Sequence, residues 1–238
     1  MSSNEKIPWK RLSAEAVAIV ASILLAFAID TWWEDRKDAE LESGYLVSIR
    51  EDFEANRALL ERSISRYENI IRSMTVLLEQ SALSEPNMEV TELNQKFSLI
   101  QSMPTFFRIT RTYENLTGSG DLNVIQSGEL KNALADYYAN AERILLVQES
   151  HEMELVQTFQ PYIIENLDYS AVHYSRVDEY PLPPPVNEES ILEVLDTQQF
   201  RNILTQKWMI STDLLSEYRD QLELTNGIIE ILDSHGRN

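Results

Sequence analysis

The three histidines of this chain are the side chains best suited to exchange protons or to bind a metal at neutral pH. His151 begins the run H-E-M-E-L, which looks like the start of the zinc-protease motif H-E-x-x-H. That motif needs a second histidine four residues on, about one helical turn away, and Leu155 stands there instead. The Glu-x-x-His pairs of di-iron bundles are missing as well, because the residues three positions before the histidines are Gln148, Ser170 and Leu232. The sequence therefore predicts no metal site.

Other catalytic residue types form no recognisable arrangement. Gly118-Ser119-Gly120 lacks the spacing of a nucleophile elbow and the lysine of a phosphate loop, and the end of a helix explains it. The 39 acidic residues are so dense that carboxylate pairs arise by chance, so no general acid and base can be nominated. The chain has no cysteine, which excludes thiolate catalysis, disulfides and cysteine-bound metals. We therefore expect no catalytic residues, no cofactor and no enzymatic activity.

Four tyrosines are candidates for a binding pocket between helices. They are Tyr113, Tyr137, Tyr138 and Tyr162. Tyrosine combines an apolar ring with a polar hydroxyl, so it suits the wall of a small-molecule pocket and serves equally well to fill a core. Both alternatives stay open from the sequence.

The elements that must position these residues are helices, because no useful stretch shows the alternation of a strand. A near-heptad stripe over residues 46–78 predicts one helix from the N-terminal apolar run to about residue 82, with Gly44 as a soft point and residues 84–87 as its end. The stripe consists of Leu46, Ile49, Phe53, Leu60, Ile64, Tyr67, Ile71, Met74 and Leu78.

Shorter repeats predict the next helices. Residues 90–100 form one, and a second is expected to begin at Pro104, whose fixed φ suits a first turn, and to end at Gly118. The residues expected on their buried faces are Val90, Leu93, Phe97 and Ile100 for the first, and Phe106, Ile109, Tyr113 and Leu116 for the second.

The C-terminal half is expected to hold a long helix from about Ser127 to about residue 167, kinked or broken at Pro161. Residues 168–187 are rich in tyrosine and proline and read as a stiff crossover loop. Helices near 188–195 and 197–234 follow, and the last carries an apolar residue every seven positions: Trp208, Leu215, Leu222 and Ile229.

An apolar run near the N-terminus predicts a membrane anchor. Extended to its tryptophans, it covers residues 12–33, from Leu12 to Trp32 and Trp33, and roughly 33 Å of helix is enough to cross a bilayer core. Two alternatives remain: a cleaved signal peptide with Ala26-Phe27-Ala28 as the cleavage site, and the buried core helix of a soluble protein.

The span has two features that favour specific contacts. Ala14, Ala18, Ser22 and Ala26 recur every four residues, which makes a flat stripe for another helix or is simply the abundance of alanine. Glu15 lies about one turn inside the span, where it either reaches the interface beside Arg11 or finds a partner or ion.

The charge is distributed very unevenly. The formal net charge is −19, yet residues 1–33 are neutral, so the whole excess lies in residues 34–238. Such an acidic body excludes nucleic-acid binding and argues against lying flat on a membrane. Lys6, Lys10 and Arg11 precede the span, whereas Arg36 and Lys37 follow it, a slight bias that places the N-terminus in the cytoplasm and the body in the periplasm.

Three blocks of residues carry a resemblance to a known family. They are Glu15, Ile23-Leu24-Leu25-Ala26, Trp33-Glu34, Arg36, Tyr45-Leu46, Ile49, Glu51-Asp52 and Asn56, then Tyr113, Leu116, Gly118, Gly120, Leu122, Ile125, Glu129-Leu130 and Tyr137-Tyr138, and last Phe200, Asn202 and Leu204. With these residues the chain resembles an uncharacterised bacterial family, domain of unknown function 6090. It departs from the family pattern at Ala21, where we expect glycine, and at Asp30, where we expect asparagine. The resemblance implies a bacterial inner-membrane protein, and it implies no activity.

These patterns predict an all-α fold, in which an N-terminal transmembrane helix runs into a long helix followed by an antiparallel helical bundle. The expected parts are a tail at 1–11, the anchor at 12–33 and an acidic helical domain at 34–238. The leading functional hypothesis is a non-enzymatic, membrane-anchored protein that binds a protein partner or itself through its helices. The alternative is a small-molecule sensor, with its pocket near the tyrosines, that signals through a partner.

Overall fold

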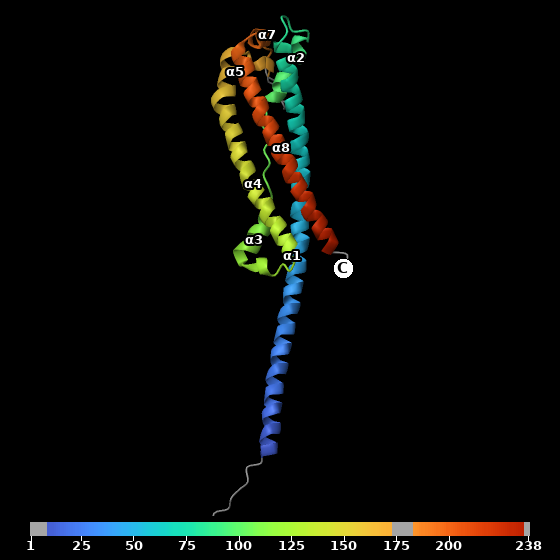
Figure 1. The fold of residues 1–238 in the computed structure, drawn as a ribbon. Coiled ribbons are helices and arrows are strands. Elements are labelled where there is room, and N and C mark those ends of the chain that lie inside the picture. The colour runs from blue at the N-terminus through green and yellow to red at the C-terminus, as the bar shows by residue number, and fades with distance from the viewer. Residues whose placement is uncertain (1–8, 173–182, 236–238) are drawn as a thin grey trace, which may run out of the picture. The chain divides into compact units, whose positions relative to one another are not determined.

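The computed structural model describes residues 9–172 and 183–235, and every regular element within these ranges is helical (Figure 1). This confirms the all-α prediction. The elements are α1 (Trp9–Ser81), α2 (Val90–Ile100), α3 (Arg111–Ser119), the 3-10 turn η1 (Asp121–Asn123), α4 (Gly128–Glu154), the π-helical η2 (Leu155–Phe159), α5 (Gln160–Asn166), α6 (Tyr169–Val172), α7 (Ser190–Leu195) and α8 (Gln198–His235).

The chain divides into two compact units. The first comprises the chain up to Ile49 together with Thr112–Gln126, and the second comprises Arg50–Arg111 and the chain from Ser127 onward. The long first helix is confirmed, since α1 ends at Ser81 and continues through Gly44 without a break.

Within the first unit, α3 and η1 are fastened to the part of α1 around Tyr45. The Tyr45 hydroxyl donates to Asp121 at 2.6 Å, and the Ser119 hydroxyl donates to the same carboxylate at 2.8 Å. Gly120 has a φ of 81°, a left-handed conformation that ends α3, as expected for the glycine pair. The Gln126 N–H donates to Glu42 of α1 at 2.6 Å. The turn that follows α3 is therefore hydrogen-bonded to α1 through both Asp121 and Gln126.

In the second unit, α1, α4 and α8 pack through seams in which buried residues alternate at intervals of three and four, the spacing of a coiled coil. The seam of α1 runs Phe53, Asn56, Leu60, Ser63, Tyr67, Ile70, Met74, Leu77 and Ser81. That of α4 runs Leu130, Leu134, Tyr137, Ala141, Ile144, Gln148 and His151, and continues into η2 at Leu155. That of α8 runs Leu204, Lys207, Ser211, Leu214, Tyr218, Gln221, Thr225, Ile228 and Leu232.

These seams correct part of the sequence interpretation. Ile64 and Ile71 of α1, and Trp208 and Leu222 of α8, were assigned to the buried stripes but lie only partly buried on the flanks. A stripe drawn through apolar residues alone runs beside the true seam. This happens because polar side chains such as Lys207 occupy seam positions and have partners inside the bundle.

Side-chain contacts between α1, α4 and α8 give the relative directions of these helices, whose colours in Figure 1 show the course of the chain. The Trp208 indole donates to Thr75 at 3.1 Å, and further along α8 the Arg219 guanidinium donates to Glu68 at 2.7 Å. Residue numbers therefore fall along α1 as they rise along α8, so these helices are antiparallel. By contrast α4 is parallel to α1, because Tyr137 packs against Phe53 and His151 against Tyr67.

The helix expected to start at Pro104 is wrong in its first half, because residues 102–110 are not helical and α3 begins only at Arg111. The Asn56 side chain accepts from the Ile109 N–H at 2.7 Å and donates to the Ile109 carbonyl at 3.0 Å. Arg111 then donates to Asp52 at 2.6 Å. Because α4 runs parallel to α1, the chain must first return along α1 to the start of α4. Extended backbone makes this return in few residues, since it covers about twice the length per residue of a helix.

Asn56→Ala is expected to lower the free energy of unfolding by about 2–3 kcal/mol, because it leaves the N–H and C=O of Ile109 without their partner beside the core. Urea unfolding followed by circular dichroism measures the change. Asn69→Ala, on the exposed side of the same helix, is the matched control and should change stability by less than about 0.5 kcal/mol. Equal effects of the two substitutions would contradict the clamping role of Asn56.

The C-terminal elements follow the expected order. Ser127 caps α4, accepting from the Leu130 N–H, and the expected break near Pro161 takes the form of the π-helical η2 just before it. The helices α7 and α8 match the two expected at 188–195 and 197–234. In the crossover, Asp168 accepts from the N–H groups of Val186 and Asn187, and residues 173–182, including His173 and Pro181, lie outside the described residues.

Candidate functional site

Polar side chains from all three long helices of the second unit meet in its core. We call this group the polar centre, and it consists of Tyr67 from α1, Gln148, His151 and Glu154 from α4, and Lys207 and Tyr218 from α8. Helical periodicity turns these side chains inward, although three of the six, Gln148, Glu154 and Lys207, are residue types that are mostly exposed in folded proteins.

His151 lies at the middle of the polar centre and is fully buried. The Lys207 Nζ lies 3.3 Å from its Nε2, and the Tyr67 hydroxyl lies 3.3 Å from its Nδ1. An ammonium group only donates, so Nε2 accepts and the neutral ring carries its hydrogen on Nδ1, which donates to Tyr67. Burial, followed by the positive charge of Lys207, lowers the pKa of His151 to about 3, so the imidazole is neutral at pH 7.

Lys207 has no exposed surface. Burial lowers the pKa of Lys207 to about 8, against the opposing effect of the Glu154 carboxylate. The ammonium also lies 4.9 Å from the centre of the Phe159 ring, within the range of a cation–π contact. Lys207 is therefore still mostly charged at pH 7, held by an imidazole nitrogen and an aromatic face.

Glu154 is the least satisfied member of the polar centre. It is only 6% exposed, and neither of its carboxylate oxygens has a hydrogen-bond partner among the described protein atoms. Burial raises the pKa of Glu154, and the charge of Lys207 partly offsets this rise. Glu154 is the last residue of α4, so it also marks the point at which the backbone changes to the π-helical η2.

A second set of hydrogen bonds joins the polar centre to the extended segment 102–110. The Gln148 side-chain carbonyl accepts from the Tyr218 hydroxyl at 2.6 Å and from the Phe106 N–H at 3.1 Å. Burial raises the pKa values of Tyr67 and Tyr218, so both hydroxyls stay protonated. These bonds make the polar centre a link between helices, since its groups face each other rather than solvent.

The polar centre does not match the expected tyrosine site. Tyr137 and Tyr138 do lie together, with ring centroids 5.0 Å apart, and both pack on Phe53. Tyr162 stacks on Phe200 in another core cluster, and Tyr113 belongs to the first unit. The structure thus brings together two of the four residues and places the others elsewhere.

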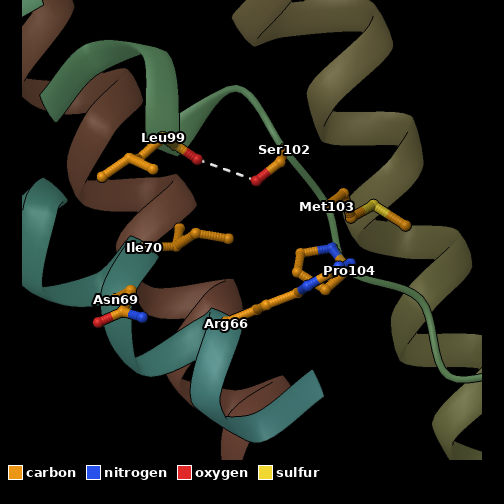
Figure 2. A pocket seen from close by; sticks show the side chains of 7 residues that line it. All are labelled: Arg66, Asn69, Ile70, Leu99, Ser102, Met103 and Pro104. Atoms are coloured by element: carbon orange, nitrogen blue, oxygen red, sulfur yellow. Dashed lines mark hydrogen bonds between the residues drawn. The ribbon is translucent and has the colours of Figure 1, made fainter. Parts of the chain in front are cut away.

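Surface hollows of the second unit have other linings. One, of about 450 Å³, lies between Arg66, Asn69 and Ile70 of α1 and residues 99–104 (Figure 2). Another, of about 540 Å³, lies between residues 103–107 on one side and residues 145–160 of α4, η2 and α5 on the other. Neither is lined by any of the four tyrosines. Across the part of the chain that the structure describes, no three acidic or histidine side chains are arranged to hold a metal ion.

The candidate anchor residues lie on the N-terminal part of α1. Among the described residues this helix alone is long and apolar enough to cross a membrane, with a mean hydropathy of 1.9 over its best window and none of that window buried. This exposure counts against a core helix of its own chain. The side chains of Glu15, Ala18, Ser22, Ala26, Trp32 and Trp33 are all exposed, and those of Leu12 and Ala14 lie outside the description.

Sequence reasoning missed Lys207, Gln148 and Tyr218 as members of one site. The signal that would have found them is the three-and-four spacing itself, continued through polar positions from Leu204 to Leu214 instead of from one apolar residue to the next. The sequence matches no protein-family model, no curated protein and no solved structure.

Proposed function

We propose that this chain is a single-pass protein of the bacterial inner membrane that presents a helical bundle to a protein partner and is not an enzyme. The observation that carries the proposal is the exposed apolar stretch of α1, which is part of the same unbroken helix as the first helix of the bundle. The resemblance to the family of unknown function 6090 supports the same assignment.

Physical chemistry favours lipid around this stretch. Val17, Leu24 and Phe27 each expose more than 60% of their surface, and apolar surface costs about 25 cal/mol per Å² in water. The hydroxyl of Ser22, the one polar side chain between Ala16 and Ile29, donates to the Ala18 carbonyl at 2.8 Å. This central stretch therefore carries no unpaired hydroxyl into a bilayer.

A non-enzymatic role is supported by the enclosure of the acid–base groups. His151 and Lys207 have no exposed surface, and a substrate must reach the groups that act on it. The contacts of His151 with Tyr67 and Lys207 join helices α1, α4 and α8. Such links between helices make the bundle rigid, as a protein that presents a binding surface needs to be. The partner is therefore proposed to bind an outer face of the bundle.

Labelling of a single introduced thiol tests the topology. The chain has no cysteine, so Ser234→Cys, at an exposed position near the end of α8, is the only site for a membrane-impermeant maleimide applied to intact cells. A labelled full-length band in the membrane fraction is expected, because the positive residues before the span favour a periplasmic body. Protection until lysis would place the body in the cytoplasm. A labelled soluble band shorter by about 28 residues would show a cleaved signal peptide instead of an anchor.

A further inference from the structure

We propose that the hollow between residues 103–107 and residues 145–160, here called the acidic groove, docks a helical segment of a partner protein that carries apolar residues on one face and lysine or arginine beside them. The inference rests on the proposed role as an interaction protein and names the surface and the chemistry of the partner. It depends on the groove's apolar walls, its charge, its rigidity and its length.

The walls of the acidic groove expose apolar side chains to solvent. Phe107 is 75% exposed and Val156 is 52% exposed, and both line the groove. Leu146 and Met153 extend this surface along the neighbouring stripe of α4. An aromatic ring beside aliphatic side chains in a hollow is the composition found at the centre of protein interfaces.

The charge of the groove indicates what kind of segment fits. Glu149 and Glu152 are its two ionisable lining residues, and both are exposed, so no lysine or arginine lines the hollow. An occupant with basic residues gains from both carboxylates. A second copy of this chain is disfavoured, because a symmetric contact would place the same carboxylates opposite each other and the chain as a whole has a net charge of −19.

The groove is held open by buried bonds. Gln148 forms part of its lining and accepts hydrogen bonds from Phe106 and Tyr218, so the extended wall is fixed to the core. A wall already in place loses little conformational freedom on binding, which favours affinity. The wall formed by residues 145–160 is roughly 22 Å long at about 1.5 Å per residue, which matches a partner helix of about 15 residues.

Photocrosslinking of a defined peptide tests the proposal. The full chain, in nanodiscs of zwitterionic lipid, carries a photoreactive phenylalanine derivative in place of Val156 or, as the control, in place of the similarly exposed Met209 of α8. The probe is a 15-residue helical peptide of leucine and lysine with leucine on one face. A second peptide has glutamate in place of every lysine, and a third has serine in place of every leucine.

Mass spectrometry should find at least tenfold more adduct of the leucine–lysine peptide at position 156 than at 209, and little adduct from the other two peptides. Glu149→Lys with Glu152→Lys should reduce the adduct at 156 at least tenfold. The matched control is Asp220→Lys with Glu223→Lys, which reverses two exposed charges at the same spacing on α8 and should leave the adduct unchanged.

Equal adducts at positions 156 and 209, or equal losses in the two double variants, would overturn the proposal, because binding would then follow net charge alone. Adduct from the serine-containing peptide at the same level would also overturn it, since the apolar walls would then contribute nothing. These failures leave the thiol-labelling result unaffected, and a cleaved N-terminus in that experiment would leave the acidic groove unaffected. The two proposals therefore fail separately.

Discussion

Acidification from pH 6.5 to pH 4 is expected to cost the bundle about 3 kcal/mol through His151 alone, and His151→Gln is expected to abolish this part of the pH dependence. The pKa of His151 is about 3 in the folded protein and about 6.5 in the unfolded chain. Between these values the unfolded chain binds the proton and the folded chain does not. The stability that depends on a neutral His151 is therefore fully present above pH 6.5 and is lost as the pH falls towards 3.

The groups that face the imidazole explain why the folded protein excludes this proton. Tyr67 of α1 accepts from Nδ1, the ammonium of Lys207 of α8 donates to Nε2, and Glu154 of α4 forms no hydrogen bond to the ring. A second proton on the ring would face the ammonium 3.3 Å away. Glutamine is the suitable replacement, because it can accept from Lys207 and donate to Tyr67 without titrating.

Guanidinium unfolding of the full chain in a mild detergent, at a series of pH values, measures this effect. The carboxylates contribute equally to wild type and variant, so the difference between the two curves isolates His151. Parallel curves from pH 7 to pH 4 would contradict the buried neutral imidazole. A difference that grows as the pH falls is the expected result.

The second large effect concerns Lys207 and Glu154 as a coupled pair. Glu154→Leu is expected to cost about 3 kcal/mol, because the ammonium then remains in the core without its counter-charge. Adding Lys207→Met should restore the stability to within about 1 kcal/mol of wild type, since two apolar side chains of similar size need no desolvation compensation. The coupling energy from this double-mutant cycle is the measured quantity.

The pH dependence of the same variants provides an independent readout. The pKa of Lys207 is about 8 in the folded protein and 10.5 as its ordinary value, so burying the charge costs stability below pH 8 and that cost disappears as the pH rises from 8 to 10.5. Wild type should therefore gain stability over this range, and Lys207→Met should lose that gain. Strictly additive substitutions would show that the two charges are not coupled. An unchanged rise in Lys207→Met would show that the rise does not come from Lys207.

Local periodicity and helix-breaking residues were enough to predict most helices. The repeat through Val90, Leu93 and Phe97 predicted α2, the proline at 161 predicted the irregular turn before it, and Ser127 predicted the start of α4. Each of these signals acts within about one turn of the helix it defines, so neighbouring residues are sufficient to read it. The exposed apolar run of α1 was predictable for the same reason, because length and composition alone decide whether a helix can cross a membrane.

Long-range contacts decided the rest. Residues 104–109 have a helical repeat, but Asn56 and Gln148 supply side-chain partners for the backbone of Ile109 and Phe106, and the segment is extended instead. Lys207 reads as a surface residue until the core supplies His151, which lies 56 positions earlier in the chain. The sequence by itself determined most of the helical segments and which one suits a membrane. Only the tertiary structure decided that residues 104–109 are not helical and which polar side chains are buried, because a buried polar group is stable only where a distant part of the chain provides its partner.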